Sequence, residues 1–267
     1  MKTDYIYLYN NSFISFLNLM KELIKNKIIP LNIKNLDYQK TLIDETIYLN
    51  IDDNEDIINE IIGKVGINIF NTIYYIFISN NENKEIIIFH FFIHSLKYKN
   101  KIFYMRNIKS VNEALKISKY VSHENHKFKG FLRFKELENN VLYAEFTPEN
   151  NILFLLSKHF QERLKNEYWI IKDVKRKIIS VYDKKEFIIL NENEFILHTS
   201  KLSDEEESIE EMWKCFYKTI GIKERKNDRC RMNFMPKKYW KYITEVRDEY
   251  EKSCGQFRVK TKNEWSS

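Results

Sequence analysis

The spacing of apolar residues changes repeatedly along the chain, and this feature most constrains the fold. Residues 4–10, DYIYLYN, alternate polar and apolar side chains as a half-buried strand does. The next segment carries its apolar residues at helical spacing: Phe13, Phe16, Leu17, Met20 and Ile24. Because strand-like and helix-like segments follow one another, we predict an α+β fold with an antiparallel sheet and a helical C-terminal region.

Further segments repeat the two patterns. The predicted strands are short and rich in aliphatic and aromatic residues, at 45–50, 129–146 (a hairpin turning at Asn139 and Asn140), 168–173 and 177–183. The predicted helices are longer, within 53–98 (broken at Gly63 and Gly66), at 111–126, after Pro148, from Ser203, near Gly221 and after Pro236. Thr147 and Pro148 suit the cap and first turn of their helix.

The chain carries no linker that forces a division into domains. We predict an N-terminal α+β region at 1–100, an α+β domain with basic C-terminal helices at 101–250 and a tail at 251–267, with one continuous domain as the alternative. The cysteines are odd in number and widely spaced, which fits neither a disulfide framework nor a metal knuckle. No segment resembles a signal peptide or a membrane span, so we expect a cytoplasmic protein that does not associate with a membrane.

Motifs for nucleotide phosphates and for a serine nucleophile are absent from the sequence. Gly63 and Lys64 have no upstream glycine to complete a phosphate loop, and no GxSxG occurs. We therefore predict no bound cofactor.

The stretch 220–245, IGIKERKNDRCRMNFMPKKYWKYITE, combines cations with aromatic residues. The whole chain has a net charge of +6, but lysine is abundant throughout, so the local density is more informative than the total. Helical spacing predicts that Tyr239, Trp240 and Ile243 face the core while neighbouring lysines face solvent. Trp213 and Phe216 are predicted to be core residues as well.

Guanidinium and ammonium groups at this density suit a polyanion, because arginine grips a phosphate through two donors and lysine adds a point charge. The predicted phosphate contacts are cations of this stretch and two from earlier in the chain: Lys223, Arg225, Lys226, Arg229, Arg231, Arg133 and Arg176. An ordinary solvated surface is the alternative, and an acidic protein is another partner that such charge would suit.

Three histidines and a glutamate form the second candidate group: His123, Glu124, His126 and His159. These side chains could serve as acid and base, or hold a metal, if the fold brought them together. Their spacing matches no established ligand set, so we predict no metal site and favour polar or phosphate-contacting roles.

Four segments, in order, resemble one bacterial family, the probable DNA metabolism proteins. They are YLYNNSFISFL, VSHENHKFKGFLRFKEL, PENNILFLLSKHFQERLKNEYWIIKDVKR and MWKCFYKTIGIKERKNDRCRMNFMPKKYWKYITE. The family's C-terminal half is a domain of unknown function that is also found joined to uracil-DNA glycosylase-like domains. The family accompanies a radical SAM protein of DNA modification or repair.

The resemblance implies a role in DNA repair or modification, with DNA and a radical SAM enzyme as partners. Our leading hypothesis is an accessory protein that binds DNA while the partner supplies the radical chemistry. The alternative is a hydrolytic DNA-processing enzyme, a nuclease, glycosylase or phosphoesterase, that uses the histidine and glutamate cluster. A module that docks an acidic protein is a third hypothesis.

Overall fold

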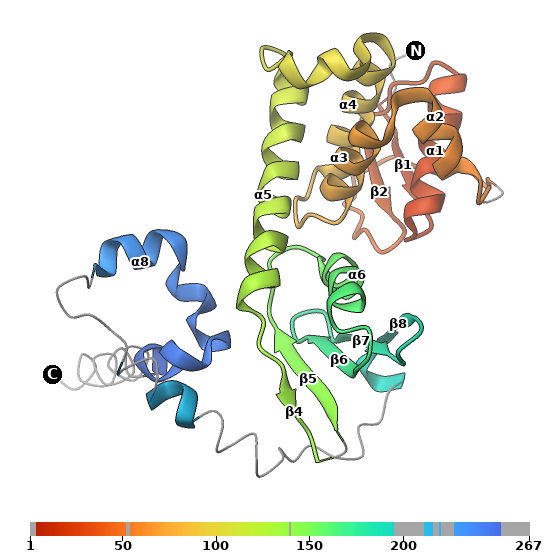
Figure 1. Ribbon diagram of the computed structural model, residues 1–267. Helices are drawn as coiled ribbons and strands as arrows, with labels where there is room; N and C mark the ends of the chain where they lie inside the picture. Colours follow the sequence, from red (N-terminus) through yellow and green to blue (C-terminus); the bar gives the residue numbers. More distant parts are fainter. Residues whose placement is uncertain are drawn as a thin grey trace, which may run out of the picture. The chain divides into compact units, whose positions relative to one another are not determined.

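The computed structural model describes residues 4–51, 54–138, 140–194, 211–215, 219 and 227–251 (Figure 1). The chain forms two compact units, 1–124 with 149–151, and 125–148 with 152–267. The division falls inside one helix, α5 (Lys109–Phe131), whose first part belongs to unit 1 and whose last turns belong to unit 2.

Unit 1 packs helices against a small parallel sheet. The sheet has the order β2-β1-β3, with bounds Asn32–Asn35, Ile6–Tyr9 and Thr46–Tyr48. The helices are α1 (Phe13–Lys25), α2 (Ile57–Val65), α3 (Ile67–Phe77), α4 (Lys84–Tyr98) and the 3-10 segment η1 (Lys99–Tyr104). All four residues of β1 are buried, because this strand lies in the middle of the sheet.

The local signals for α1 and for the α2–α3 break agree with the sequence prediction. The side chain of Ser12 caps α1 by accepting the Ser15 N–H at 2.9 Å, which satisfies a donor that the helix cannot. Gly66 lies between α2 and α3 with φ of 88°, a conformation that favours glycine. The second glycine of the predicted break, Gly63, lies inside α2.

Unit 2 contains a five-stranded mixed sheet of order β4-β5-β6-β7-β8. The strands are Lys135–Glu136, Val141–Phe146, Tyr168–Asp173, Ile178–Tyr182 and Phe187–Asn191. Helix α6 (Leu153–Arg163) connects β5 to β6, and the 3-10 segment η2 (Glu192–Glu194) follows β8. Later in the chain come α8 (Asp228–Phe234) and the 3-10 helix η4 (Lys237–Tyr242), and residues 211–215 and 244–251 are also helical.

The α+β class is confirmed, but the prediction of an antiparallel sheet is too simple. β1 pairs in parallel with both of its neighbours, and β5 pairs in parallel with β6. Parallel neighbours need a crossover connection, because the chain must return to the end of the sheet where the first strand began. Helix α6 provides this crossover between β5 and β6. β6 and β7 pair antiparallel around residues 174–177, as predicted.

Two boundaries differ from the sequence prediction. The helix expected directly after Pro148 begins at Leu153, and Thr147 makes no cap for it, because residues 149–151 bond to other parts of unit 1. The first strand of the predicted hairpin is only two residues long, since α5 continues through Phe131. Within the described residues, no helix combines the length and the apolar character that crossing a bilayer requires.

Candidate nucleic-acid interface

Helix α6 divides its side chains between the core and a polar face. Leu153, Leu156 and Phe160 are buried against the sheet, as their helical spacing predicts. His159 and Arg163 are four residues apart, so they share a face that is not occupied by the core residues. His159 is half-buried and Arg163 is exposed.

The last turn of α5 carries the neighbouring cation, Lys129. Just beyond this turn, Phe134 meets Phe160 of α6 edge to face, with the ring centres 4.9 Å apart. Aromatic pairs of this geometry stabilise their contact beyond the area they bury. The contact fixes the exit of α5 next to α6 within unit 2.

The charges of Lys129 and Arg163 both act on His159, which places the three side chains in one neighbourhood. Burial lowers the pKa of His159 below its ordinary value of 6.5, and the charges of Lys129 and Arg163 lower it further, while Glu162 acts weakly in the opposite direction. A neighbouring positive charge disfavours the protonated imidazole, which is the physical cause of the last two effects. The imidazole is therefore neutral near pH 7, with the two cations in its neighbourhood.

The charges of Lys129 and Arg163 are not neutralised by the protein's own described carboxylates. Within the part of the chain that the structure describes, neither residue has an acidic group within ion-pair distance. Uncompensated cations on one surface create a positive potential that attracts anions. We call Lys129, His159 and Arg163 the α5–α6 cationic site.

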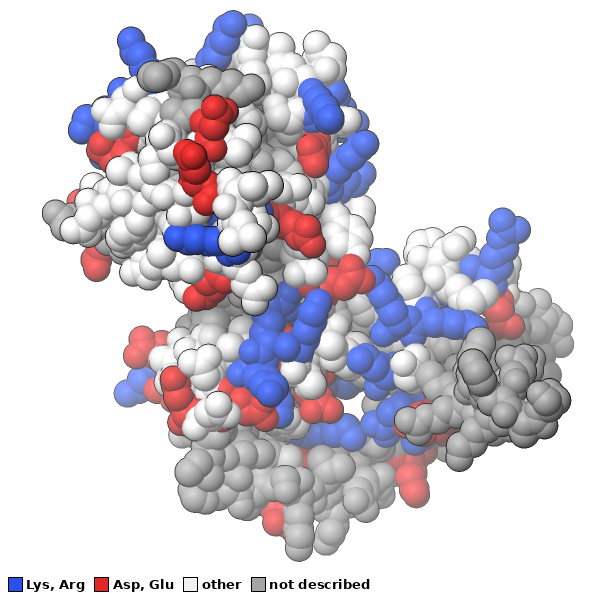
Figure 2. Space-filling model, turned by 180° about the vertical axis from the view of Figure 1, so that it is seen from behind, with Lys and Arg blue, Asp and Glu red and all other residues white. Residues whose placement is uncertain are grey.

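Lysines from the C-terminal segment lie along the same end of α5. Tyr239 packs against Phe128 and Phe131, with ring centres 5.1 and 5.4 Å apart. The ammonium groups of Lys127 and Lys238 lie over the Tyr239 ring at 5.5 and 5.2 Å. Figure 2 shows lysine and arginine side chains gathered in unit 2, with acidic ones among them.

Burial of the C-terminal aromatic residues follows the sequence prediction in part. Tyr239, Trp240 and Ile243 are buried, and the lysines Lys237, Lys238 and Lys241 are exposed, as predicted. Trp213 is 47% exposed, which contradicts its assignment to the core. Phe216, the other residue of this prediction, lies outside the described residues.

Three of the arginines predicted to contact phosphate form ion pairs within the protein. Arg133 lies 3.5 Å from Glu245, and Arg176 lies 2.9 Å from the fully buried Asp173. Arg231 forms two hydrogen bonds with Glu249, of 3.2 and 2.7 Å, and lies 3.3 Å from Asp228.

A carboxylate that already neutralises a guanidinium reduces its attraction for an external phosphate. Arg229 is exposed on α8, and none of the carboxylates that the structure describes lies within ion-pair distance of it. The other three predicted cations, Lys223, Arg225 and Lys226, lie outside the described residues.

The histidine and glutamate cluster is distributed between different environments. Glu124 is buried and accepts hydrogen bonds from the Glu149 N–H at 2.8 Å and from Asn150 N–H and Nδ2 at 3.0 and 2.6 Å. His123 and His126 are exposed on α5. Within the described ranges, no three histidine, cysteine or acidic side chains come together as a metal site.

Sequence reasoning missed Lys129 and Arg163, although the spacing offered a signal. Lys129 lies one helical turn after His126, and Arg163 lies one turn after His159, so each cation repeats on the face of a histidine. What the spacing did not reveal is that α5 and α6 meet at this point. That meeting depends on the contact between Phe134 and Phe160.

Comparison with protein families identifies the family of this chain. A protein family described as a domain of unknown function (DUF4130) matches residues 82–245. No curated protein and no solved structure matches the chain. The matched range contains the whole α5–α6 cationic site.

Proposed function

The chain belongs to the DUF4130 family, and we propose that its α5–α6 cationic site binds the phosphate backbone of DNA. The observation that carries the proposal is the position of two unneutralised cations, Lys129 and Arg163, beside a neutral imidazole. DNA carries closely spaced phosphates, and cations that replace its counterions provide most of the affinity of sequence-independent binding.

Each member of the site has a role that fits its chemistry. Arg163 presents a planar guanidinium that can donate two parallel hydrogen bonds to one phosphate. Lys129 supplies a compact charge on a flexible stem. His159 can donate a hydrogen bond in its neutral form and gains a proton when a phosphate offsets the neighbouring cations.

The lysines around Tyr239 extend this surface along α5. Lys127 is held against the ring of Tyr239, and Lys241 lies 4.6 Å from the ring centre of Tyr242. Because the Tyr239 ring is buried against α5, we assign it to packing and not to stacking on a base. Arg229 adds an exposed guanidinium on α8.

The biological role that we propose is that of an accessory protein in DNA repair or modification. The chain holds DNA for a separate radical SAM enzyme, which carries the iron–sulfur cluster and performs the radical chemistry. Support for this partner comes from the resemblance of four ordered segments to the probable DNA metabolism proteins. The cationic surface supports the proposed contact with DNA and does not bear on the radical SAM partner.

A salt titration tests the DNA contact. Fluorescence anisotropy with a labelled 20-base-pair duplex is measured at several salt concentrations for the wild type and for Lys129→Ala/Arg163→Ala. Each lost phosphate contact reduces the slope of log affinity against log salt by roughly 0.9, so we expect the double variant to lose about 1.8. The matched control is Lys101→Ala/Arg106→Ala, which removes the same charges from exposed positions of unit 1.

Two results would overturn the proposal. One is the absence of binding by the wild type at 50 mM salt, and the other is an equal loss of slope in both double variants. Co-purification with the radical SAM enzyme after nuclease treatment tests the partner separately. The chain could bind no DNA by itself and still form a complex with the enzyme that survives nuclease treatment. That combination would instead support a protein-docking role for the basic surface.

A further inference from the structure

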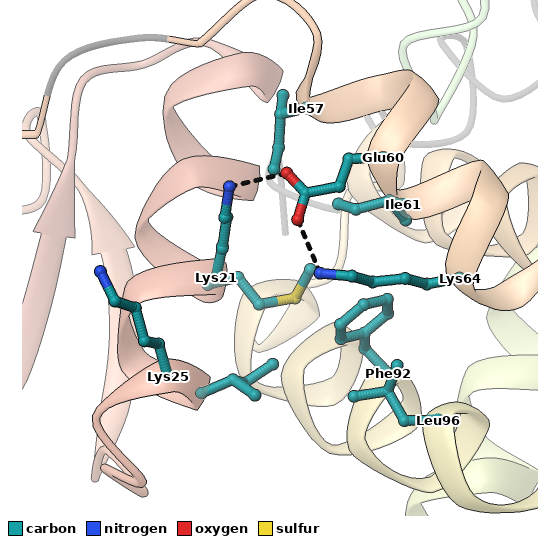
Figure 3. Close-up of a pocket in the computed structure, with 10 residues that line it drawn as sticks. Lys21, Lys25, Ile57, Glu60, Ile61, Lys64, Phe92 and Leu96 are labelled. Carbon is teal, nitrogen blue, oxygen red and sulfur yellow. Dashed lines mark hydrogen bonds and ion pairs between the residues drawn. The ribbon is translucent and has the colours of Figure 1, made fainter.

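Unit 1 contains a pocket of about 260 Å³ between α1, α2 and α4 (Figure 3). Its floor is apolar, because the lining residues Met20, Ile57, Ile61 and Phe92 are each buried hydrophobic side chains. Such a concave apolar surface with a few polar groups at its edge is typical of small-molecule sites.

The rim of the pocket is charged, and its charges do not cancel. Both oxygens of Glu60 are occupied, since Lys21 Nζ lies 2.6 Å from Oε2 and Lys64 Nζ lies 2.6 Å from Oε1. Figure 3 shows the two ammonium groups on either side of this carboxylate. Lys25 is a third lysine among the lining residues, but it pairs with Glu22 at 3.3 Å, so the excess positive charge comes from Lys21 and Lys64.

The lysine pair keeps donors for a further anion. An ammonium group has three N–H donors, and Glu60 accepts one hydrogen bond from each lysine. The hydrogen bonds from Lys21 and Lys64 lower the pKa of Glu60, so this carboxylate stays ionised and holds both ammonium groups at the rim. One glutamate therefore positions two lysines and leaves an excess of positive charge.

We propose that this pocket binds a small amphiphilic carboxylate. The hydrocarbon part lies against Met20, Ile61 and Phe92, and the carboxylate accepts hydrogen bonds from Lys21 and Lys64 at the rim. A charged group at the edge of an apolar pocket selects a ligand of opposite charge, because the wrong sign leaves a desolvated charge without a partner.

The size of the pocket limits the ligand. Pockets for drug-sized molecules span roughly 300–1,000 Å³, and this one is smaller. Octanoate is therefore a suitable probe, with octylammonium and octanol as matched ligands that reverse or remove its charge. Hexanoate shortens the chain by two methylene groups.

Isothermal titration calorimetry on the full chain tests the proposal. We expect octanoate to bind, octanol to bind at least about tenfold more weakly because it loses charge-assisted hydrogen bonds, and octylammonium not to bind. Each buried methylene contributes about fourfold in affinity (about 0.8 kcal/mol), so hexanoate is expected to bind about fifteenfold more weakly.

Variants locate the binding. Ile24→Trp and Leu96→Trp each place an indole in the pocket from a partly exposed position, and both are expected to abolish octanoate binding. Lys21→Gln/Lys64→Gln is expected to weaken it about tenfold or more. The matched control is Lys40→Gln/Lys101→Gln, which removes two exposed lysines elsewhere in unit 1.

Three results would refute the carboxylate site: no heat with octanoate at millimolar concentration, equal binding of octanoate and octylammonium, or full binding by both folded tryptophan variants. Circular dichroism identifies which variants are folded. The DNA titration depends on Lys129 and Arg163, and octanoate binding depends on the pocket residues. Either proposal can therefore fail without affecting the other.

Discussion

Glu124 of α5 holds Asn150 through two hydrogen bonds to one carboxylate oxygen. Its Oε2 atom accepts the backbone N–H of Asn150 at 3.0 Å and the side-chain Nδ2 at 2.6 Å, and Oε1 accepts the N–H of Glu149. Asn150 Oδ1 in turn accepts the N–H of Asn80. Glu124 thus fixes the segment 149–151 within unit 1 and delays the start of α6.

Replacement of Glu124 is expected to destabilise the protein. Glu124→Ala leaves buried N–H donors without acceptors, which should lower the free energy of unfolding by about 3 kcal/mol. Glu113→Ala removes an exposed carboxylate from the same helix and is expected to change it by less than about 0.5 kcal/mol. Urea denaturation measures both, and a Glu124→Ala protein as stable as the control would contradict this structural role.

Arg176 is expected to matter for stability more than for DNA affinity. Its guanidinium neutralises Asp173, which is fully buried, so Arg176→Ala leaves a buried charge and should cost about 2–3 kcal/mol. Lys175→Ala is the matched control, since its exposed side chain forms no ion pair with a described carboxylate. Denaturation gives the stability, and a loss of about 0.9 in salt slope for folded Arg176→Ala would instead assign Arg176 to a phosphate.

Arg229→Ala and Arg231→Ala are expected to have opposite effects on DNA binding and on stability. Arg231 lies 4.5 Å from the Trp240 ring and bonds to Glu249, so Arg231→Ala should lower the free energy of unfolding by about 1–2 kcal/mol. Arg229 is exposed, and Arg229→Ala should reduce the DNA salt slope by roughly 0.9 with stability unchanged. Each variant controls for the other, and a reversed pattern would mean that Arg231 faces the phosphates.

The pH dependence of DNA binding is expected to report His159. Its pKa is lowered in the free protein, chiefly by burial and then by Lys129 and Arg163, and a bound phosphate should raise this pKa. The complex then holds more protons than the free protein, so affinity increases as the pH falls from 7.5 to 6. The gain reaches at most about tenfold for each unit by which the pKa rises.

His159→Gln isolates this contribution from the other histidines. We expect the variant to lose the part of the pH dependence that comes from His159, as measured by anisotropy at pH 6 and pH 7.5. The same pH dependence in both proteins would exclude His159 from the interface. In the absence of DNA, the lowered pKa of His159 affects the stability of the folded protein. As the pH falls below 6.5, His159 of the unfolded chain binds a proton more readily than His159 of the folded chain, so the free energy of unfolding decreases.

The sequence alone determined the elements whose pattern is local. The apolar spacing from Phe13 onward specified α1, because a helix brings residues three and four apart onto one face. Residues 168–183 specified the β6–β7 pair, because two short apolar segments on either side of a tight turn favour antiparallel pairing. The burial of Tyr239 and Trp240 was predicted in the same way.

Only the tertiary structure decided which charges remain available to a ligand. Arg133 and Glu245 are 112 residues apart, and Glu124 and Asn150 are 26 apart, so no local pattern predicts that they meet. The α5–α6 cationic site likewise depends on Phe134 reaching Phe160. Helical and strand periodicity follow from bonds between neighbouring residues, whereas the neutralisation of a charge depends on which distant side chain the fold places beside it.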